Sequence, residues 1–256
     1  MRLIWRTSAL EARRLRQFMA GASRDPFVQA RARRNLARTK REISRTAFWH
    51  ALVGALLTTQ QKSGPKSAVA RFMAARPFLL AYPTCRSQRR VDVFVTRTLS
   101  AFGGLRRSTR IGKELSANLS TLEGGLWQEV LDRLNSLRPL ATPEAERETA
   151  EFLDDAFVGL GPKQSRNLLQ GLALTRYEIP IDSRLTKWLN EFGFPLHLAA
   201  SGLSDRHYYG LVSQGVQQLC AAAKVMPCVF DAAVFASFDN GGWQAGNIEE
   251  WGYDGA

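Results

Sequence analysis

Apolar residues recur along most of this chain at intervals of three and four positions, with polar residues between them. That period is typical of amphipathic helices, whereas strict alternation, the period of half-buried strands, is scarce. The pattern therefore predicts an all-α protein. Helices are expected at residues 10–20, 29–57, 66–75, 111–119, 126–137, 143–157, 163–172, 183–192, 205–223 and 227–238, and residues 89–102 are either helical or partly extended.

Glycine and proline separate these helices, and the tightest junction precedes residue 163. There the sequence Gly159-Leu160-Gly161-Pro162 is typical of a hairpin between the end of one helix and the start of the next. Glycine permits positive φ and lets backbone N–H groups approach a ligand closely. Proline suits the first turn of a helix, where its missing N–H is not needed. The positive end of the second helix thus predicts an anion site that fits a phosphate.

Lys163 directly follows this hairpin, and nineteen positions later the run Ile-Pro-Ile-Asp ends at Asp182. The hairpin with its lysine resembles that of the helix-hairpin-helix DNA glycosylases, and the second run resembles the loop that carries the aspartate of this superfamily. The spacing is most similar to that of the 8-oxoguanine glycosylase/AP (apurinic/apyrimidinic site) lyase branch. The resemblance covers mainly residues 52–75 and 151–193.

The resemblance implies a helix-hairpin-helix glycosylase fold, with two helical subdomains and the active site in the cleft between them. We expect basic N-terminal helices in residues 1–50 and a first subdomain formed by residues 51–150 and 194–256. That subdomain would carry a wedge loop, which fills the gap left by an extruded base, and a C-terminal pocket helix. Residues 151–193 would carry the hairpin and the catalytic loop of the second subdomain.

The chemistry that the resemblance implies requires both side chains. Cleavage of an N-glycosidic bond builds positive charge on the sugar, which the carboxylate of Asp182 would stabilise most in the transition state. Lys163, neutral for part of the time, would form a Schiff base at the same carbon, and β-elimination would release the 3′ phosphate. Burial and the positive end of its helix would both lower the lysine pKa. Two alternatives stay open: Lys163 only contacts phosphate, or Asp182 only caps the next helix.

An apolar segment at residues 48–57 runs into the polar cluster 58–63 before Gly64-Pro65 ends it. This run resembles the superfamily segment whose polar side chain replaces a flipped base. Gln60 is the expected wedge, with Gln61 next, because an enzyme that extrudes a base must plug the hole that it leaves. An ordinary capped helix end is the alternative.

Further candidates surround these motifs. Asn167, four positions after the lysine, has an amide that can both donate to and accept from a base edge. The C-terminal helix resembles one that lines the base pocket of the smaller 8-oxoguanine glycosylases, which adds Asp231, Phe235 and Phe238. The alternative for these residues is a helix face packed in the core. The expected DNA-binding residues are Gly159, Leu160, Gly161, Gln60, Gln61, Arg166 and Arg184.

Charge is distributed unevenly along the chain. The sequence has 35 Lys and Arg against 23 Asp and Glu, a net charge of +12. Residues 1–110 hold 24 basic and 4 acidic side chains, a net +20, whereas the remainder holds 11 basic and 19 acidic side chains, a net −8. The basic first part predicts one wall of a groove for a polyanion. An RNA or membrane-surface partner, and a merely solvated basic face, stay open as alternatives.

Cys85, Cys220 and Cys228 are too few for a four-cysteine iron–sulfur cluster, and the histidines are scattered. No metal or other cofactor is expected, apart from a monovalent cation at the hairpin carbonyls that the resemblance implies. No apolar run reaches the roughly 18 to 20 residues that span a bilayer. The expected protein is a monomer in the cytoplasm or nucleoid, with no membrane partner.

Together these features predict a DNA repair enzyme of the base excision type. Its expected activities are those of a DNA glycosylase and AP lyase that excises 8-oxoguanine or a related damaged base from double-stranded DNA. One alternative is a monofunctional DNA glycosylase of other base specificity, in which Lys163 only binds phosphate. The other is a non-catalytic helix-hairpin-helix DNA-binding protein.

Overall fold

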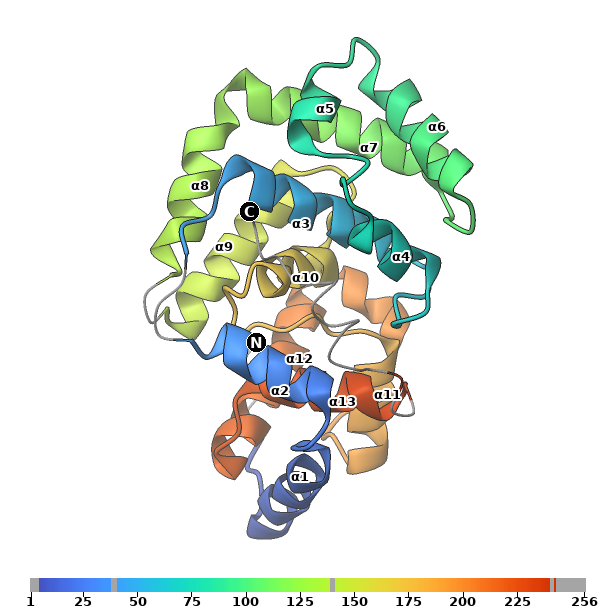
Figure 1. The fold of residues 1–256 in the computed structure, drawn as a ribbon. Coiled ribbons are helices and arrows are strands. Elements are labelled where there is room, and N and C mark those ends of the chain that lie inside the picture. The colour runs from blue at the N-terminus through green and yellow to red at the C-terminus, as the bar shows by residue number, and fades with distance from the viewer. Residues whose placement is uncertain (1–4, 38–40, 139–140, 240–241, 243–256) are drawn as a thin grey trace.

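The computed structural model describes residues 5–37, 41–138, 141–239 and 242, and within these ranges the chain consists of helices and loops without a β-strand (Figure 1). The predicted all-α class is confirmed. The helices are α1 (Ala9–Ala22), α2 (Pro26–Asn35), α3 (Arg45–Leu57), α4 (Ala68–Ala74), α5 (Tyr82–Arg86), α6 (Val91–Phe102), α7 (Ser108–Thr121), α8 (Trp127–Ser136), α9 (Pro143–Ala156), α10 (Pro162–Gly171), α11 (Ser183–Phe192), α12 (Arg206–Ala223) and α13 (Pro227–Ser237). A π-helical turn, Leu122–Leu126, joins α7 to α8, and a 3₁₀ turn, Ala200–Ser204, precedes α12.

One predicted helix, over residues 29–57, is two helices in the structure. α2 ends at Asn35 and α3 begins at Arg45. Ser44 forms the N-cap of α3, where its hydroxyl accepts a hydrogen bond of 3.1 Å from the N–H of Ala47. A serine cap satisfies an N–H group that has no carbonyl partner at the start of a helix. The apolar period alone did not reveal this break.

Two large hydrophobic cores organise the helices, and the helices that build them form an upper and a lower group in Figure 1. The first is built mainly by α3 to α10 and contains the fully buried rings of Phe48 and Trp49. The second is built mainly by α1, α11, α12 and α13 and contains the fully buried rings of Tyr209 and Phe230. α10 contacts α3 and α9 of the first group, while α2 packs on α13 of the second. Burial of these apolar surfaces is the main force that holds each group together.

This grouping differs from the expected division, which joined residues 194–256 to 51–150 and set 1–50 apart. The described residues after Gly193 share their core with the N-terminal helices instead: the ring of Trp5 lies 5.1 Å from that of Phe194, centroid to centroid. Residues 151–174 belong to the first core. The difference arises because apolar faces pair by shape across the whole chain, and the helical period alone does not say which faces meet.

α12 and α13 both contribute buried residues to the second core. Within the described residues, no single helix combines the length and the apolar character needed to cross a membrane; α12 and α13 meet both conditions only as a pair, bent by 99°. The three cysteines are buried. No three His, Cys, Asp or Glu side chains of the described ranges gather as a metal site, and the predicted lack of a metal cofactor stays a prediction.

Candidate active site

The hairpin between α9 and α10 is held in a shape that only glycine permits. Gly159 has φ of +86°, in the left-handed region. A Cβ at this position would lie 2.6 Å from the carboxyl carbon of Glu114 and 2.8 Å from a methyl group of Leu56. Both α7 and α3 therefore approach the hairpin backbone directly, which explains why the sequence has a glycine here.

Asn118 of α7 anchors the same hairpin through two hydrogen bonds. Its Nδ2 donates to the carbonyl of Val158 at 3.0 Å, and its Oδ1 accepts from the N–H of Val158 at 2.8 Å. Asn118 is fully buried, whereas the Val158 side chain is 57% exposed. The amide thus fixes the hairpin backbone while the tip of the hairpin faces outward.

The first turn of α10 leaves backbone N–H groups without a side-chain cap. Gly161 is its N-cap residue and provides no side-chain acceptor, and Pro162 occupies the first helical position. The N-terminal N–H groups of a helix and its positive dipole end attract anions. Gly161 and Leu160 are only half-buried, so this end of α10 is accessible at the hairpin surface.

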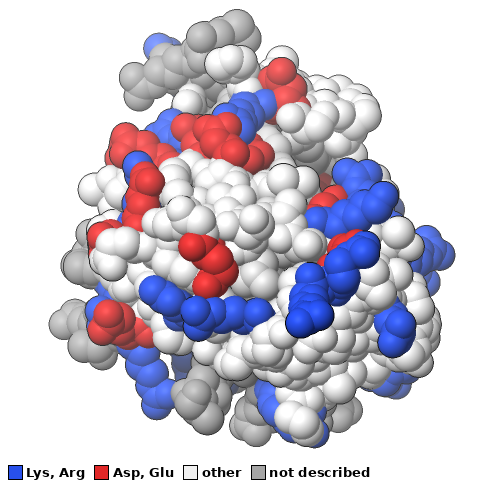
Figure 2. Space-filling view, turned by 90° about the horizontal axis from the view of Figure 1, so that it is seen from above, with Lys and Arg blue, Asp and Glu red and all other residues white. Residues whose placement is uncertain are grey.

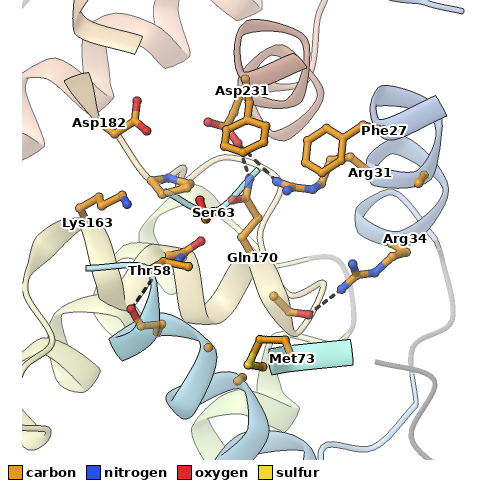
Figure 3. Close-up of a pocket in the computed structure, with 18 residues that line it drawn as sticks. Phe27, Arg31, Arg34, Thr58, Ser63, Met73, Lys163, Gln170, Asp182 and Asp231 are labelled. Carbon is orange, nitrogen blue, oxygen red and sulfur yellow. Dashed lines mark hydrogen bonds and ion pairs between the residues drawn. The ribbon is translucent and has the colours of Figure 1, made fainter. Parts of the chain in front are cut away.

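Lys163 and Asp182 line one cavity of about 140 Å³ at the junction of the two cores (Figure 3). One water needs only about 10–15 Å³ of such volume, so the cavity can admit a considerably larger group. The helices α2, α3, α10 and α13 and the loop before α11 contribute its wall. The lining residues are Phe27, Ala30, Arg31, Arg34, Ala51, Gly54, Ala55, Thr58, Ser63, Met73, Lys163, Asn167, Gln170, Gly171, Pro180, Asp182, Asp231 and Phe235.

The cavity lowers the pKa of Lys163 below its usual value. Burial is the main cause, because it disfavours the charged ammonium, and the cation of Arg184 acts in the same direction. The carboxylates of Asp182 and Asp231 act in the opposite direction. A lysine whose pKa is lowered is more often neutral at physiological pH, and only the neutral amine is nucleophilic.

Asp182 is the N-cap residue of α11. Its Oδ1 accepts hydrogen bonds from the N–H groups of Arg184 at 2.9 Å and Leu185 at 3.1 Å. Its Oδ2 has no hydrogen-bond partner among the described residues. The cap therefore orients the carboxylate and leaves one oxygen for a group in the cavity, so capping and a role in the cavity are compatible.

The chain segment that leads to Asp182 is held by hydrogen bonds and an ion pair to α9 and α10. Glu146 of α9 accepts hydrogen bonds of 2.8 to 2.9 Å from the backbone N–H groups of Arg176, Tyr177 and Glu178. Arg166 of α10 pairs with Glu178 at 2.7 Å, and both side chains are at most 3% exposed. This buried network fixes the path of the chain between α10 and Asp182.

Two predicted site residues lie elsewhere. Arg166 was expected to bind DNA, but it is buried against Glu178 and its guanidinium lies 4.7 Å from the centre of the Tyr209 ring. Phe238 was expected in the base pocket, but it ends α13 and packs on the second core outside the cavity. In both cases the side chain points to a different face of its helix from the one expected, and the sequence period did not distinguish these faces.

The other predicted pocket residues line the cavity. The Asn167 amide donates hydrogen bonds to Thr58 Oγ1 at 2.9 Å and to Gln164 Oε1 at 3.4 Å, which ties α10 to the end of α3. Asp231 and Phe235 come from one face of α13. The guanidinium of Arg184 lies over the Phe235 ring at 4.3 Å, so Arg184 is half-buried at the cavity rather than on an open surface.

The two glutamines of the predicted wedge loop differ in their surroundings. Gln60 is exposed, has φ of +56° and makes no hydrogen bond to a described residue through its side chain. Gln61 is bound at both ends of its amide: Nε2 donates to the carbonyl of Leu57, and Oε1 accepts from the N–H of Arg106 at 2.9 Å. Gln60 is therefore available to an outside partner, whereas Gln61 holds the loop in place.

α2 contributes cavity residues that the sequence analysis missed. Phe27, Ala30, Arg31 and Arg34 all line the cavity, and their spacing of three, four and seven positions places them on one face of the helix. The repeated arginines on that face were the available signal. They were assigned only to one wall of a polyanion groove, because nothing in the sequence showed that α2 packs on α13.

Basic side chains gather beside the wedge loop. The hydrogen bond of Gln61 to Arg106 brings the start of α7 to this loop, and Lys62, Arg106 and Arg110 are exposed there. Figure 2 shows a dense group of Lys and Arg on the right of the molecule as seen from above, while Asp and Glu lie mostly on the left, where further Lys and Arg lie among and below them. The two kinds of charge are thus only partly separated on this face.

Comparison with known proteins identifies the fold. No protein-family model matches the sequence, and no curated protein matches it at a significant level. The fold is similar to the crystal structure of the 8-oxoguanine DNA glycosylase of Methanocaldococcus jannaschii, with a TM-score of 0.64 over 90% of this chain and 94% of that one. The two sequences are 12% identical. The chain therefore has the helical fold of that glycosylase, which confirms the predicted fold class.

Proposed function

We propose that this protein is a DNA glycosylase with AP-lyase activity that excises 8-oxoguanine or a related damaged base from double-stranded DNA. One observation carries the proposal: Lys163, at the start of the helix after the glycine hairpin, shares a cavity with the carboxylate of Asp182. Burial lowers the pKa of that lysine, as a nucleophilic amine requires. The fold that the chain shares with an 8-oxoguanine DNA glycosylase supports the same activity.

The first chemical step breaks the bond between the base and the sugar. The neutral amine of Lys163 forms a bond to C1′ while the base leaves with the electron pair of the N-glycosidic bond and takes up a proton. Positive charge that develops on the sugar is stabilised by the carboxylate of Asp182 in a site with little water. The cap bonds to Arg184 and Leu185 hold this carboxylate in place before the reaction begins.

The second step cleaves the DNA strand. The nitrogen of the lysine adduct loses a proton, and its electron pair then breaks the C1′–O4′ bond. The ring opens, O4′ takes up a proton, and C1′ and the lysine nitrogen form a Schiff base. Removal of a C2′ proton then expels the 3′ phosphate by β-elimination, and water hydrolyses the Schiff base to release Lys163. The lysine nitrogen supplies the electron pair for the Schiff base and the C2′–H bond supplies the pair for the elimination, so the step involves no net oxidation or reduction.

DNA would contact the protein at three places around the cavity. The first-turn N–H groups of α10 suit a backbone phosphate, and the exposed cations Lys62, Arg106 and Arg110 suit its neighbours. Gln60 is exposed, and its side chain makes no hydrogen bond to another described residue, which supports a role in filling the gap left by the extruded base. These features support a duplex substrate.

Borohydride trapping tests the nucleophile. The wild-type protein, incubated with duplex that contains 8-oxoguanine, should yield a covalent protein–DNA adduct, because borohydride reduces the Schiff base to a stable amine. Lys163→Gln should yield none. An adduct of undiminished yield in that variant would contradict the assignment of Lys163, and base excision without any adduct in the wild-type protein would identify a monofunctional glycosylase.

Asp182→Asn separates the carboxylate charge from its capping role. The asparagine Oδ1 can still accept the two N–H bonds at the start of α11, so thermal melting should change little. Base excision should fall by about a hundredfold or more, the usual loss when one preorganised electrostatic group is removed. Duplex binding in a gel-shift assay should persist. Excision at the wild-type rate would exclude the role proposed for Asp182.

A further inference from the structure

An ion pair closes the cavity on the side away from the lysine. Arg31 Nη1 of α2 lies 3.3 Å from Asp231 Oδ2 of α13, and the two side chains are 14% and 12% exposed. Figure 3 shows Lys163 and Asp182 on one side of the cavity and Phe27, Arg31 and Arg34 on the other. A group that reached in from the Lys163 side would therefore meet this pair.

The pair and its neighbour retain unused hydrogen-bonding groups. Gln170 Nε2 donates to the same Asp231 Oδ2 at 2.7 Å. Among the described residues, neither Gln170 Oε1 nor Asp231 Oδ1 accepts a hydrogen bond, and only one N–H group of the Arg31 guanidinium donates to a carboxylate. A guanidinium has five N–H donors. The wall thus offers donors from one side chain and acceptors from two others.

The buried position of the ion pair between Arg31 and Asp231 favours a role in ligand binding over a role in stabilising the fold. Taking two charges out of water costs free energy that a single contact of 3.3 Å does not recover well. The rings of Phe27 and Phe235, 5.2 Å apart, border the pair and provide the apolar surface that a flat aromatic group requires. A planar ligand with both donors and acceptors along one edge matches these surroundings.

We infer that Arg31, held by Asp231, determines which bases the cavity accepts and selects those that present a carbonyl oxygen to it. Arg31 donates to that oxygen, while Asp231 Oδ1 and Gln170 Oε1 accept from N–H groups on the same edge. An amino group in place of the oxygen would place one N–H donor against another, and the N–H of Arg31 that faces the base would have no acceptor, although Arg31 keeps its contact with Asp231. The inference rests on the proposed glycosylase function and names its substrate class: oxo bases rather than amino bases.

Pairs of lesions that exchange one carbonyl oxygen for an amino group, with the ring N–H that accompanies the oxo form, test the selection. Single-turnover excision should be measured on 8-oxohypoxanthine against 8-oxoadenine, and on 5-hydroxyuracil against 5-hydroxycytosine, each in one duplex sequence opposite the same base. The wild-type protein should favour the oxo member of each pair by about 10- to 100-fold, the effect of one hydrogen bond to a charged group. Arg31→Gln should reduce this ratio about tenfold, because an amide can accept as well as donate.

Two further variants serve as matched comparisons. Arg31→Lys keeps the charge but not the planar fork of donors, and it should reduce the ratio partly. Arg33→Ala, which removes an exposed arginine from the same helix, should leave the ratio within twofold of the wild-type value. Melting temperatures establish that each variant is folded.

An abasic duplex distinguishes failure of this inference from failure of the proposed function. It has no base for Arg31 to contact, so Arg31→Gln should lower base excision at least tenfold more than it lowers cleavage of the abasic site. A wild-type protein that neither excises a base nor traps on DNA overturns the proposed function. Active protein whose oxo-to-amino ratio is the same in wild type and Arg31→Gln, or whose two activities fall equally in the variant, overturns the inference alone.

Discussion

The pKa of Lys163, and therefore its ability to act as a nucleophile, depends on several neighbouring groups. Burial and Arg184 lower its pKa, while Asp182 and Asp231 raise it, and the net direction is downward. A solvated lysine at the same helix end would remain an ammonium and would bind phosphate only. The charged side chains that change its protonation come from the N-cap and first turn of α11 and from α13.

Gly159→Ala tests the close approach at the hairpin. The variant should lose at least about 2 kcal/mol of unfolding free energy, because the left-handed conformation penalises a Cβ by about 1–2 kcal/mol and the added atom meets Glu114 and Leu56. Chemical denaturation measures this loss.

Gly161→Ala is the matched control for that hairpin variant. Its φ of −146° is extended, and no heavy atom lies within 4 Å of an added Cβ. Its loss should stay below about 1 kcal/mol, the modest preference for glycine over alanine at an N-cap. Equal losses in the two variants would show that the packing of Gly159 is not what holds the hairpin.

Asp231→Asn tests the cost of a buried charge through its dependence on pH. Burial raises the pKa of Asp231 to about 6 from 3.8, against the opposing effect of Arg31. The folded state therefore binds more protons than the unfolded state between about pH 4 and 6, so this group's contribution to stability falls as the pH rises.

The comparison of the two proteins isolates this contribution. Relative to Asp231→Asn, the wild-type protein should lose up to about 3 kcal/mol of unfolding free energy across that range, since one pKa unit corresponds to about 1.36 kcal/mol. Denaturant titrations of both proteins at several pH values measure the difference. A difference that is constant with pH, or that changes in the opposite direction, would contradict the raised pKa.

Some helix boundaries can be predicted from the sequence more directly than others. α11 begins after the Asp182 cap and ends at Gly193, whose φ of +106° suits glycine, and the predicted range 183–192 is confirmed. The break between α2 and α3 was missed although Ser44 is a good cap, because both flanks continue the helical period. Local signals place an element well when a cap and a stop residue agree.

Substitution of Gln60 in the wedge loop should lower base excision without lowering stability. Gln60→Gly removes the side chain and also relieves the positive φ, so thermal stability should be retained or slightly increased. Excision from lesion duplex should nevertheless fall, and it should fall more than excision from single-stranded DNA, since only a duplex leaves a gap to fill.

Gln61→Ala provides the opposite pattern within the same loop. It removes the acceptor of the Arg106 N–H and should lower stability by about 1 kcal/mol. Its effects on duplex and single-stranded substrates should be similar. If Gln60→Gly affects both substrates equally, the wedge role of Gln60 is wrong.

The two cores meet at the cavity, and this explains why residues from both ends of the sequence line it. Phe27 and Arg31 come from the N-terminal helices, Lys163 from the middle and Asp231 from the last helix. Charge is distributed unevenly along the chain, and exposed cations beside the wedge loop create a positive electrostatic potential near this junction. A charged substrate is attracted to such a surface before specific contacts form.

Salt dependence measures how many of these cations contact phosphate. The logarithm of the association constant for lesion duplex should fall linearly with the logarithm of salt concentration. Lys62→Ala or Arg106→Ala should each reduce the slope by about 0.9 if the residue neutralises one phosphate. Arg133→Ala is the control, because α8 lies on the opposite side of the fold from α4 and the wedge loop (Figure 1). An equal change in slope for Arg133→Ala would show that binding depends on overall charge alone.

Local features of the sequence were sufficient for the helical class, most helix boundaries and the glycine hairpin, whereas the pairing of Lys163 with Asp182 was expected from the resemblance to the helix-hairpin-helix DNA glycosylases. These local features act over one or two turns of chain, where dihedral preference and capping dominate. The burial of Arg166 and the meeting of Arg31 with Asp231, 200 positions apart, came only from the packing of distant helices. Whether a charge faces water or a buried partner depends on which apolar faces combine, and that follows from shape and burial over the entire chain.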